Sequence, residues 1–460
     1  MTRREYGTVI ILFLAGILFL CFVWKKKTKS SSSLIFTFLT SILLHGIYIG
    51  YTPTWERQHD VIGFENAKGI GQAAYIEWFY NNWSLPNFDP RERWGFFQPA
   101  LHHIIAAIWL KINIIAGFGY TAATENIQIL MLIYCIVLTI YALRIYKLCG
   151  LEGRSLETAF ALTALHPSLV LLSGSVNNDT LCIMLMVMTC FYALKWEKNS
   201  NYANILKTAL CTGLSMMTKL SGVLTAPAVA WLFLIKWLVG GKKDFVRYLK
   251  QYLIFACVSI PLGMFFPLRN YFLFGIPFNY TPEVGEKLVY KTVASRFTDL
   301  ITKTPFAAMI KNGDDFDEYN ILLAGLKTSL TGEFNFAAGN SYMLPVAWGL
   351  FISAVILMLI TVVSVIKVIV AGKNIIPLQI RVFWSILYLT AIAFYLRLCL
   401  SIPNFSSQDF RYIAYLIVPN ALCIGLMRQN VAGFFRTIIT LFALIFTFSS
   451  TVLYLLLGLP

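Results

Sequence analysis

Charged side chains are scarce in this sequence of 460 residues: Asp, Glu, Lys and Arg make up 13%. That is about half the share of an average soluble domain. Apolar residues account for 58% of the chain, more than the core of a soluble protein of this size needs. The composition excludes a water-soluble enzyme, a disordered chain and a disulfide-rich secreted scaffold. It predicts an all-α polytopic membrane protein with a single membrane domain over residues 1–460.

The sequence also lacks the motifs that bind nucleotides. It has no Walker loop, no Rossmann glycine fingerprint and no Gly-x-Ser-x-Gly elbow. We therefore expect no coupling to a nucleotide within the chain. The nine cysteines all fall in or beside apolar runs, and none has the spacing of a disulfide framework or a cysteine metal site.

Twelve runs are apolar enough to cross a bilayer, whose core takes about 20 helical residues. They cover 7–24, 34–51, 126–147, 157–175, 179–196, 203–218, 222–240, 250–267, 344–370, 381–400, 412–427 and 437–457. A further stretch, 99–117, contains polar residues, and we expect it to lie along the interface or to enter part-way. The first run is not expected to be a cleaved signal peptide, because the lysines of 25–29 follow it as a cytoplasmic anchor.

If the lysines of 25–29 are placed on the cytoplasmic side, the charged residues behind the net charge of +15 divide unequally between the two sides of the membrane. The loops that then fall inside hold 20 basic and four acidic residues, and the remainder of the chain holds 17 and 18. This distribution obeys the positive-inside rule, so the charge indicates orientation rather than nucleic-acid binding. Two outside segments are long, 52–125 and 268–343, and functional residues are expected there.

The first outside loop carries a candidate general base. Asp60 follows His59 a few residues after a span. A carboxylate so close to the bilayer surface suits the removal of a proton from a hydroxyl acceptor, although a solvated turn residue is the alternative. Further along, residues 70–83 predict an amphipathic helix that anchors the loop at the interface. Its apolar face consists of Tyr75, Ile76, Phe79 and Trp83.

Five segments form an ordered series along the chain. They are the first loop with His59-Asp60, Gly71 to Trp78, Asn82 to Pro86 and Gln98 to Leu101; then Leu172 to Leu181; Gly213 to Lys219; Pro267 to Gly275; and Asp409 to Tyr412. The series resembles membrane glycosyltransferases of the GT-C superfamily, in particular the bacterial protein O-mannosyltransferase and lipid A aminoarabinose transferase group. The chain departs from that pattern in having one acid at Asp60 instead of an acidic pair, and Gln72 where the family often has histidine.

The resemblance implies a GT-C-type bundle of about 12 transmembrane helices. It also implies transfer of a sugar from a polyprenyl-phosphate donor to a glycan, lipid or protein acceptor on the outer face. Asp60 would be the base, with His59 beside it. Asp179 would orient Asp60 or the acceptor, or help to hold a divalent cation, and its alternative role is to cap a helix. Asp60, Asp179 and His103 are the possible ligands if a divalent cation is used.

The leaving phosphate of such a donor needs positive groups to stabilise it. Lys219 is the first candidate, because a cation at membrane depth is costly and therefore functional unless it reaches the headgroups. Arg269 and Arg411 also lie at the outer ends of spans, and three converging cations would form a phosphate clamp. The remaining candidate substrate-binding residues are Gln98, His102, His103 and Tyr271.

Other functions stay open on the sequence. A lipid or glycan transporter would need charged or broken spans near the middle of the membrane. An O-antigen polymerase or ligase also uses an outside loop with arginines, and a structural scaffold needs no converging charges. The acidic residues of 314–318 in the second long loop are a solvated turn or a cation site. We expect the chain in a bacterial plasma membrane, among membrane lipids and without a nucleic-acid partner.

Overall fold

All regular elements in the described part of the chain are helices, as the sequence predicts. The computed structural model describes residues 32–240, 242–278, 280–282, 292–299, 320–334, 336, 343–370, 375–404 and 406–458. The predicted span 7–24, the lysines of 25–29 and the acidic residues of 314–318 lie outside these ranges.

The chain divides into two compact units. Unit 1 contains Thr52–Leu148 and Leu172–Pro282, and unit 2 contains the described parts of Ile11–Tyr51, Cys149–Leu171 and Glu283–Pro460. The boundary in the sequence falls inside helix α8 (Pro167–Gly174). All candidate site residues except Arg411 belong to unit 1.

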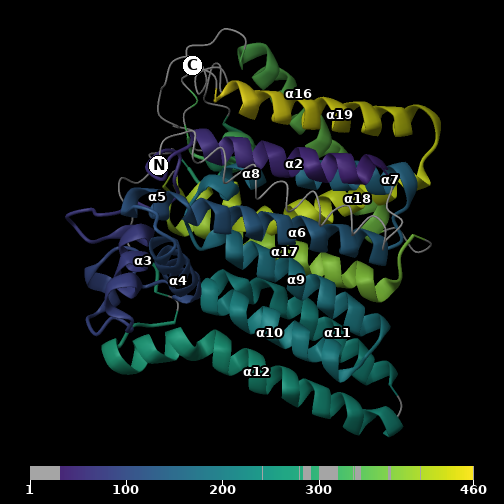
Figure 1. The fold of residues 1–460 in the computed structure, drawn as a ribbon. Coiled ribbons are helices and arrows are strands. Elements are labelled where there is room, and N and C mark those ends of the chain that lie inside the picture. Colours follow the sequence, from purple (N-terminus) through teal and green to yellow (C-terminus); the bar gives the residue numbers. More distant parts are fainter. Residues whose placement is uncertain are drawn as a thin grey trace. The chain divides into compact units, whose positions relative to one another are not determined.

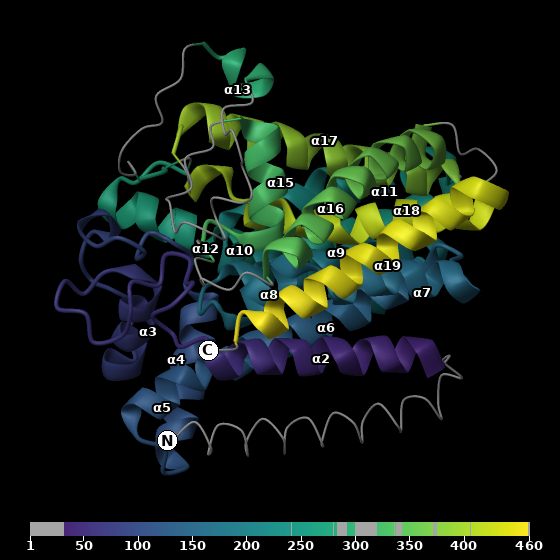
Figure 2. The same ribbon diagram turned by 90° about the horizontal axis from the view of Figure 1, so that it is seen from above.

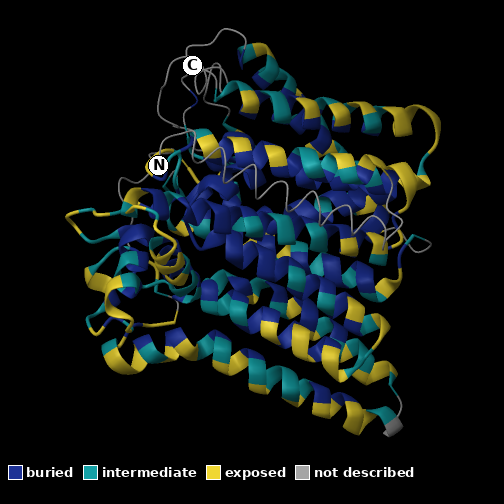
Figure 3. Ribbon diagram, in the orientation of Figure 1, coloured by how far each residue is buried: buried dark blue, intermediate teal, exposed yellow. Residues whose placement is uncertain are grey.

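Unit 1 joins the segment 52–125 to a group of long helices (Figure 1). Its elements are α3 (Gly71–Asn82), η1 (Pro90–Glu92), α4 (Leu101–Ile115), α5 (Tyr120–Glu125), α6 (Ile127–Leu148), α9 (Asp179–Lys198), α10 (Tyr202–Thr218), η2 (Leu220–Thr225), α11 (Ala226–Val239) and α12 (Lys242–Phe274). Helix α10 packs between α9 and α12, and α3 packs on α4. Most residues of α9 are buried, whereas α12 has many exposed residues (Figure 3). The exposed side chains of α12 are largely apolar, as on a helix that faces lipid.

Unit 2 is a second group of helices, in which α16 and α19 lie side by side (Figure 2). Its elements are α2 (Ser32–Tyr51), α7 (Gly153–Ala164), α13 (Ser295–Thr298), α15 (Ile321–Thr331), α16 (Met343–Val365), η3 (Ile366–Val370), α17 (Leu378–Ser401), η4 (Ser406–Gln408), η5 (Phe410–Leu416), α18 (Ile417–Asn430) and α19 (Gly433–Leu456). Helices α7 and α18 pack together, and so do α2 and α7.

Within the described ranges, nine helical stretches are long and apolar enough to cross a membrane, or ten if the bent pair α7 and α8 counts as one span. The predicted membrane protein is therefore confirmed. The span predicted at 157–175 is bent by 41° between its two helices. Pro167 explains the break, because proline disfavours helical backbone at the preceding residue. Helix α10 has 17 residues and is not among the nine.

Two predicted boundaries differ from the structure. The second long loop was expected to begin at residue 268, but α12 continues through Pro267 and ends at Phe274. Proline removes one helical hydrogen bond without forbidding the turns on either side, so a lipid-facing helix can run through it. The amphipathic helix also ends earlier than expected, at Asn82. Trp83 lies beyond it in a left-handed conformation and is 56% exposed, so it does not share the buried face of Tyr75, Ile76 and Phe79.

Candidate active site

The backbone around Asp60 is held in an unusual conformation. Asp60 and Ile62 have φ angles of 58° and 63°, a region that a β-branched residue rarely occupies. The Asp60 and Val61 carbonyls accept hydrogen bonds from the amides of Gln72 and Ala73 at 3.0 and 3.2 Å. These amides belong to the first turn of α3, whose donors have no partner within the helix. The start of α3 therefore fixes the position of the Asp60 backbone, and such strain often accompanies a functional site.

Gln58 fastens the same loop to the turn that precedes α9. Its amide nitrogen donates to the Gly174 carbonyl at 2.8 Å, and its amide oxygen accepts from the Val176 amide at 2.9 Å. The His59 amide donates to the Ser175 hydroxyl at 3.1 Å. His59 and Asp60 are thereby held beside the segment that leads to Asp179.

Asp179 and Lys219 form an ion pair. Helices α9 and α10 are consecutive, joined by a short turn and packed together, so the start of α9 lies beside the end of α10. The side chains of both residues are largely buried, at 6% and 13% exposure. Asp179 is the first residue of α9 and follows the cap residue Asn178, so its carboxylate binds Lys219 instead of capping the helix.

The side chain of Asn178 links two of the predicted motifs. Its amide nitrogen donates to the Thr218 carbonyl at 3.1 Å and to the Gln98 side-chain oxygen at 3.4 Å. Thr218 is the residue before Lys219. Gln98 is therefore linked, through Asn178, to the residue that precedes Lys219.

His102 and His103 are both fully buried at the start of α4. Burial lowers the pKa of His102 to about 3, against a smaller opposing effect of the Asp179 carboxylate. Burial and the neighbouring His102 also lower the pKa of His103 well below its usual value. Nε2 of His103 lies 2.5 Å from the Gln72 side-chain oxygen. Neither ring nitrogen of His102 has a hydrogen-bond partner among the described residues, so a neutral, polar imidazole is buried near Asp179.

Arg269 and Tyr271 lie near the end of α12 and make different contacts. The Arg269 guanidinium donates to the Pro86 carbonyl and, at 3.1 Å, to the Asn270 side chain. It also lies 5.5 Å from the centre of the Phe274 ring. Arg269 thus joins α12 to the segment 52–125. Tyr271 is half exposed and packs its ring against Phe272 and Phe278.

Arg411 belongs to unit 2, as the second residue of η5. Asp409 caps this short helix, and its carboxylate accepts from the Arg411 amide at 2.7 Å. The guanidinium is buried, lies 5.1 Å from the Tyr412 ring centre and donates to the Tyr412 hydroxyl at 3.3 Å. A clamp formed by Lys219, Arg269 and Arg411 stays a prediction.

Sequence reasoning missed several residues of this arrangement. Asn178 lies within the predicted motif Leu172 to Leu181 but had no role of its own there, and Gln58 gave no signal. Both side chains bridge segments that lie far apart in the chain. Gln72 was noticed only as a departure from the family pattern, and in the structure it contacts His103. In unit 2 the buried Arg296 was also missed; it donates to the Gln408 side chain at 2.7 Å, and the Gln408 carbonyl accepts from Tyr395 at 2.5 Å.

Two of the possible metal ligands contact other groups. Asp179 pairs with Lys219, and His103 contacts Gln72 through Nε2. A divalent cation at Asp60, Asp179 and His103 would have to share these side chains with their present partners. It stays a prediction, and no step proposed below uses it.

The described helices define an integral membrane protein of the all-α class. No protein-family model and no curated protein sequence matches the chain. Among solved structures, apo ArnT from Cupriavidus metallidurans matches with a TM-score of 0.51 and 8% identity, over 93% of this chain and 77% of that one. ArnT from the same organism bound to undecaprenyl phosphate matches with a TM-score of 0.38 and 13% identity, over 88% and 82%. ArnT is a lipid A aminoarabinose transferase of the GT-C superfamily, so the predicted GT-C-type fold is confirmed, while the count of about 12 helices stays a prediction.

Proposed function

We propose that the chain is a glycosyltransferase that moves a sugar from a polyprenyl-phosphate donor to a hydroxyl acceptor on the outer face of a bacterial plasma membrane. The fold shared with ArnT and the ordered series of five motifs support this proposal. The main supporting observation is that hydrogen bonds hold the Asp60 loop against the turn before Asp179, which in turn pairs with Lys219. Three of the five motifs therefore lie together in unit 1.

In this mechanism Asp60 acts as the general base. Its carboxylate takes the proton of the acceptor hydroxyl while the hydroxyl oxygen attacks the anomeric carbon of the sugar. The bond between the anomeric carbon and the phosphate oxygen breaks, and the polyprenyl phosphate leaves with the bonding electrons. General bases of this kind contribute about 10²- to 10⁴-fold to a rate.

The charge that develops on the leaving phosphate needs a cation that is already in place. Lys219 supplies it in this proposal, with Arg269 and Arg411 as further candidates. Asp179 holds the Lys219 ammonium at a fixed position and offsets the cost of burying that charge. Asn178 and Gln98 then orient the turn beside it.

The test is a transfer assay on the purified full chain in lipid nanodiscs, with a panel of radiolabelled polyprenyl-phosphate sugars and candidate glycan, lipid and protein acceptors. The wild type should transfer label from at least one donor, and Asp60→Asn should lower the rate by about 10²-fold or more. Glu92→Gln is the matched control, because Glu92 is an exposed acid on the same loop.

Both variants should elute as single species and unfold at the wild-type temperature. Full activity in Asp60→Asn would remove Asp60 as the base. Movement of intact donor across the membrane without cleavage would point to a transporter, and extension of a lipid-linked glycan would point to a polymerase or ligase.

A further inference from the structure

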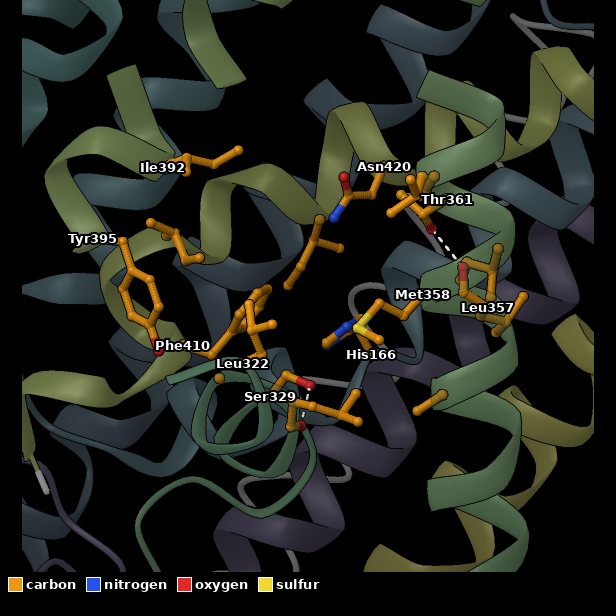
Figure 4. Close-up of a pocket in the computed structure, with 18 of the residues that line it drawn as sticks. His166, Leu322, Ser329, Leu357, Met358, Thr361, Ile392, Tyr395, Phe410 and Asn420 are labelled. Carbon is orange, nitrogen blue, oxygen red and sulfur yellow. Dashed lines mark hydrogen bonds between the residues drawn. The ribbon is translucent and has the colours of Figure 1, made fainter. Parts of the chain in front are cut away.

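Unit 2 contains a cavity of about 380 Å³ that none of the predicted site residues lines. It lies between α15, α16, α17, η5, α18, α19 and the bend between α7 and α8 (Figure 4). The volume falls in the usual range for small-ligand sites. At about 30 Å³ for each water-sized group, it holds roughly a dozen non-hydrogen atoms. The space therefore fits a segment of one hydrocarbon chain.

The lining of the cavity is almost entirely apolar and carries no charge. Leucine, isoleucine, valine, alanine and phenylalanine form most of the wall, and the described residues contribute no acid, lysine or arginine to it. An ionised group would lose its hydration here without gaining a counter-charge. A charged headgroup or a free carboxylate is thereby disfavoured as the buried part of a ligand.

Two polar groups nevertheless point into the cavity, and both are hydrogen-bond donors (Figure 4). Nδ1 of His166 accepts from the Ser168 amide at 3.2 Å, so the neutral ring carries its proton on Nε2. The Asn420 side-chain oxygen accepts from the Tyr388 hydroxyl at 2.7 Å, which leaves the amide nitrogen turned toward the cavity. No hydrogen bond within the described residues uses either donor.

The other polar side chains of the wall direct their protons to the backbone. Ser329 donates to the Leu326 carbonyl, Thr361 to the Leu357 carbonyl and Tyr395 to the Gln408 carbonyl. The cavity thus offers a ligand two donors within hydrocarbon. A buried donor without an acceptor is costly, so the fitting ligand is an apolar chain that carries acceptor oxygens.

We propose that this cavity binds one ester-linked acyl chain of a membrane lipid, with the ester oxygens accepting from His166 Nε2 and Asn420 Nδ2. An ester is uncharged and offers two acceptor oxygens, which matches both the apolar wall and the donor pair. A polyprenyl chain has no oxygen along its hydrocarbon and would leave both donors unsatisfied. None of the candidate phosphate-binding residues lines this cavity, although Arg411 lies between Phe410 and Ile413, which do.

Native mass spectrometry of the purified full chain tests the proposal with three probes: dipalmitoyl phosphatidylcholine, its dihexadecyl ether analogue and undecaprenyl phosphate. The ether analogue has the same chains and headgroup but lacks the carbonyl oxygens. The wild type should bind the ester lipid about tenfold more tightly than the ether lipid, as expected for one to two hydrogen bonds. Asn420→Leu and His166→Phe should each reduce this preference, and the double variant should abolish it.

Thr361→Val is the matched control, because Thr361 lines the cavity but donates to its own helix, so the preference should persist. Ala354→Phe fills the space and should remove one bound ester lipid from every protein. Equal binding of ester and ether lipids by the wild type would overturn the proposal. Loss of bound undecaprenyl phosphate, instead of ester lipid, in Ala354→Phe would also overturn it.

Discussion

Replacing Gly71 by alanine should displace the loop that carries Asp60. Gly71 has a φ angle of 91°, where an L-residue is strained by roughly 1–2 kcal/mol. A Cβ atom at this position would also lie 2.6 Å from the Val61 carbonyl oxygen and 2.9 Å from the Ile62 Cβ. Contacts that close cannot persist, so the backbone of Val61 and Ile62 has to move by a substantial fraction of an ångström.

Gly63→Ala separates the backbone strain from the steric clash. Gly63 has the same φ angle of 91°, but no atom lies within 4 Å of its Cβ position. Gly63→Ala should therefore lower the free energy of unfolding only by the backbone strain, about 1–2 kcal/mol. Gly71→Ala should cost more and should lengthen the bonds from the Gln72 and Ala73 amides to the loop. Since displacements of about 1 Å at a catalytic group can cost 10²-fold, its proposed transfer rate should fall by roughly ten- to a hundredfold.

Hydrogen exchange measures this displacement without reference to activity. The Gln72 and Ala73 amides are protected by the Asp60 and Val61 carbonyls and should exchange faster in Gly71→Ala than in Gly63→Ala. The thermal unfolding temperature should also fall further in Gly71→Ala. Equal exchange at these two amides and equal unfolding temperatures in the two variants would refute the reasoning.

Three further predictions concern contacts around the same site. Gln58→Leu removes two hydrogen bonds that join the loop to Gly174 and Val176, and should lower the free energy of unfolding by about 1–3 kcal/mol in a denaturant titration. Lys219→Met leaves the buried Asp179 carboxylate without its ammonium partner and should cost about 3–5 kcal/mol, most of which a second change, Asp179→Asn, should restore. Burial lowers the pKa of His102 to about 3, so unfolding takes up protons below about pH 6.5 and stability should fall as the pH drops from there toward 3. In His102→Phe, the unfolding temperature should fall less steeply between pH 6.5 and 3 than in the wild type. An unchanged pH dependence would contradict the role given to His102.

The spanning helices could be predicted because a bilayer imposes a length and a composition that a single sequence displays. The runs at 344–370 and 437–457 correspond closely to helices of the structure. Breaks within an apolar run are harder to predict. Pro167 bends one predicted span, whereas α12 continues through Pro267, and the local sequence does not distinguish the two outcomes. A proline removes one helical hydrogen bond in either case, so the outcome depends on whether surrounding groups satisfy the freed backbone atoms.

The individual site residues were predictable by type, and their partners were not. Asp179 and Lys219 stand 40 positions apart, and only the antiparallel packing of α9 and α10 brings them together. The sequence does not reveal the bridging roles of Gln58 and Asn178 either, because a glutamine or asparagine on a loop is common and carries no periodicity. Sequence analysis finds charged residues, because burying a charge in a membrane is costly. It does not find the uncharged polar residues that position those charges.

The ion pair with Asp179 bears on whether Lys219 can act as a phosphate-binding cation. An isolated buried ammonium would pay a desolvation cost that favours the neutral amine, and a neutral amine cannot stabilise a leaving phosphate. A carboxylate in contact offsets that desolvation cost, and it fixes the position of the ammonium before any substrate arrives. In the proposed mechanism, the donor phosphate meets this preorganised cation and shares it with Asp179. Because the proposal commits Asp179 to this contact, it assigns the removal of the acceptor proton to Asp60, whose backbone carbonyl accepts a hydrogen bond from the first turn of α3.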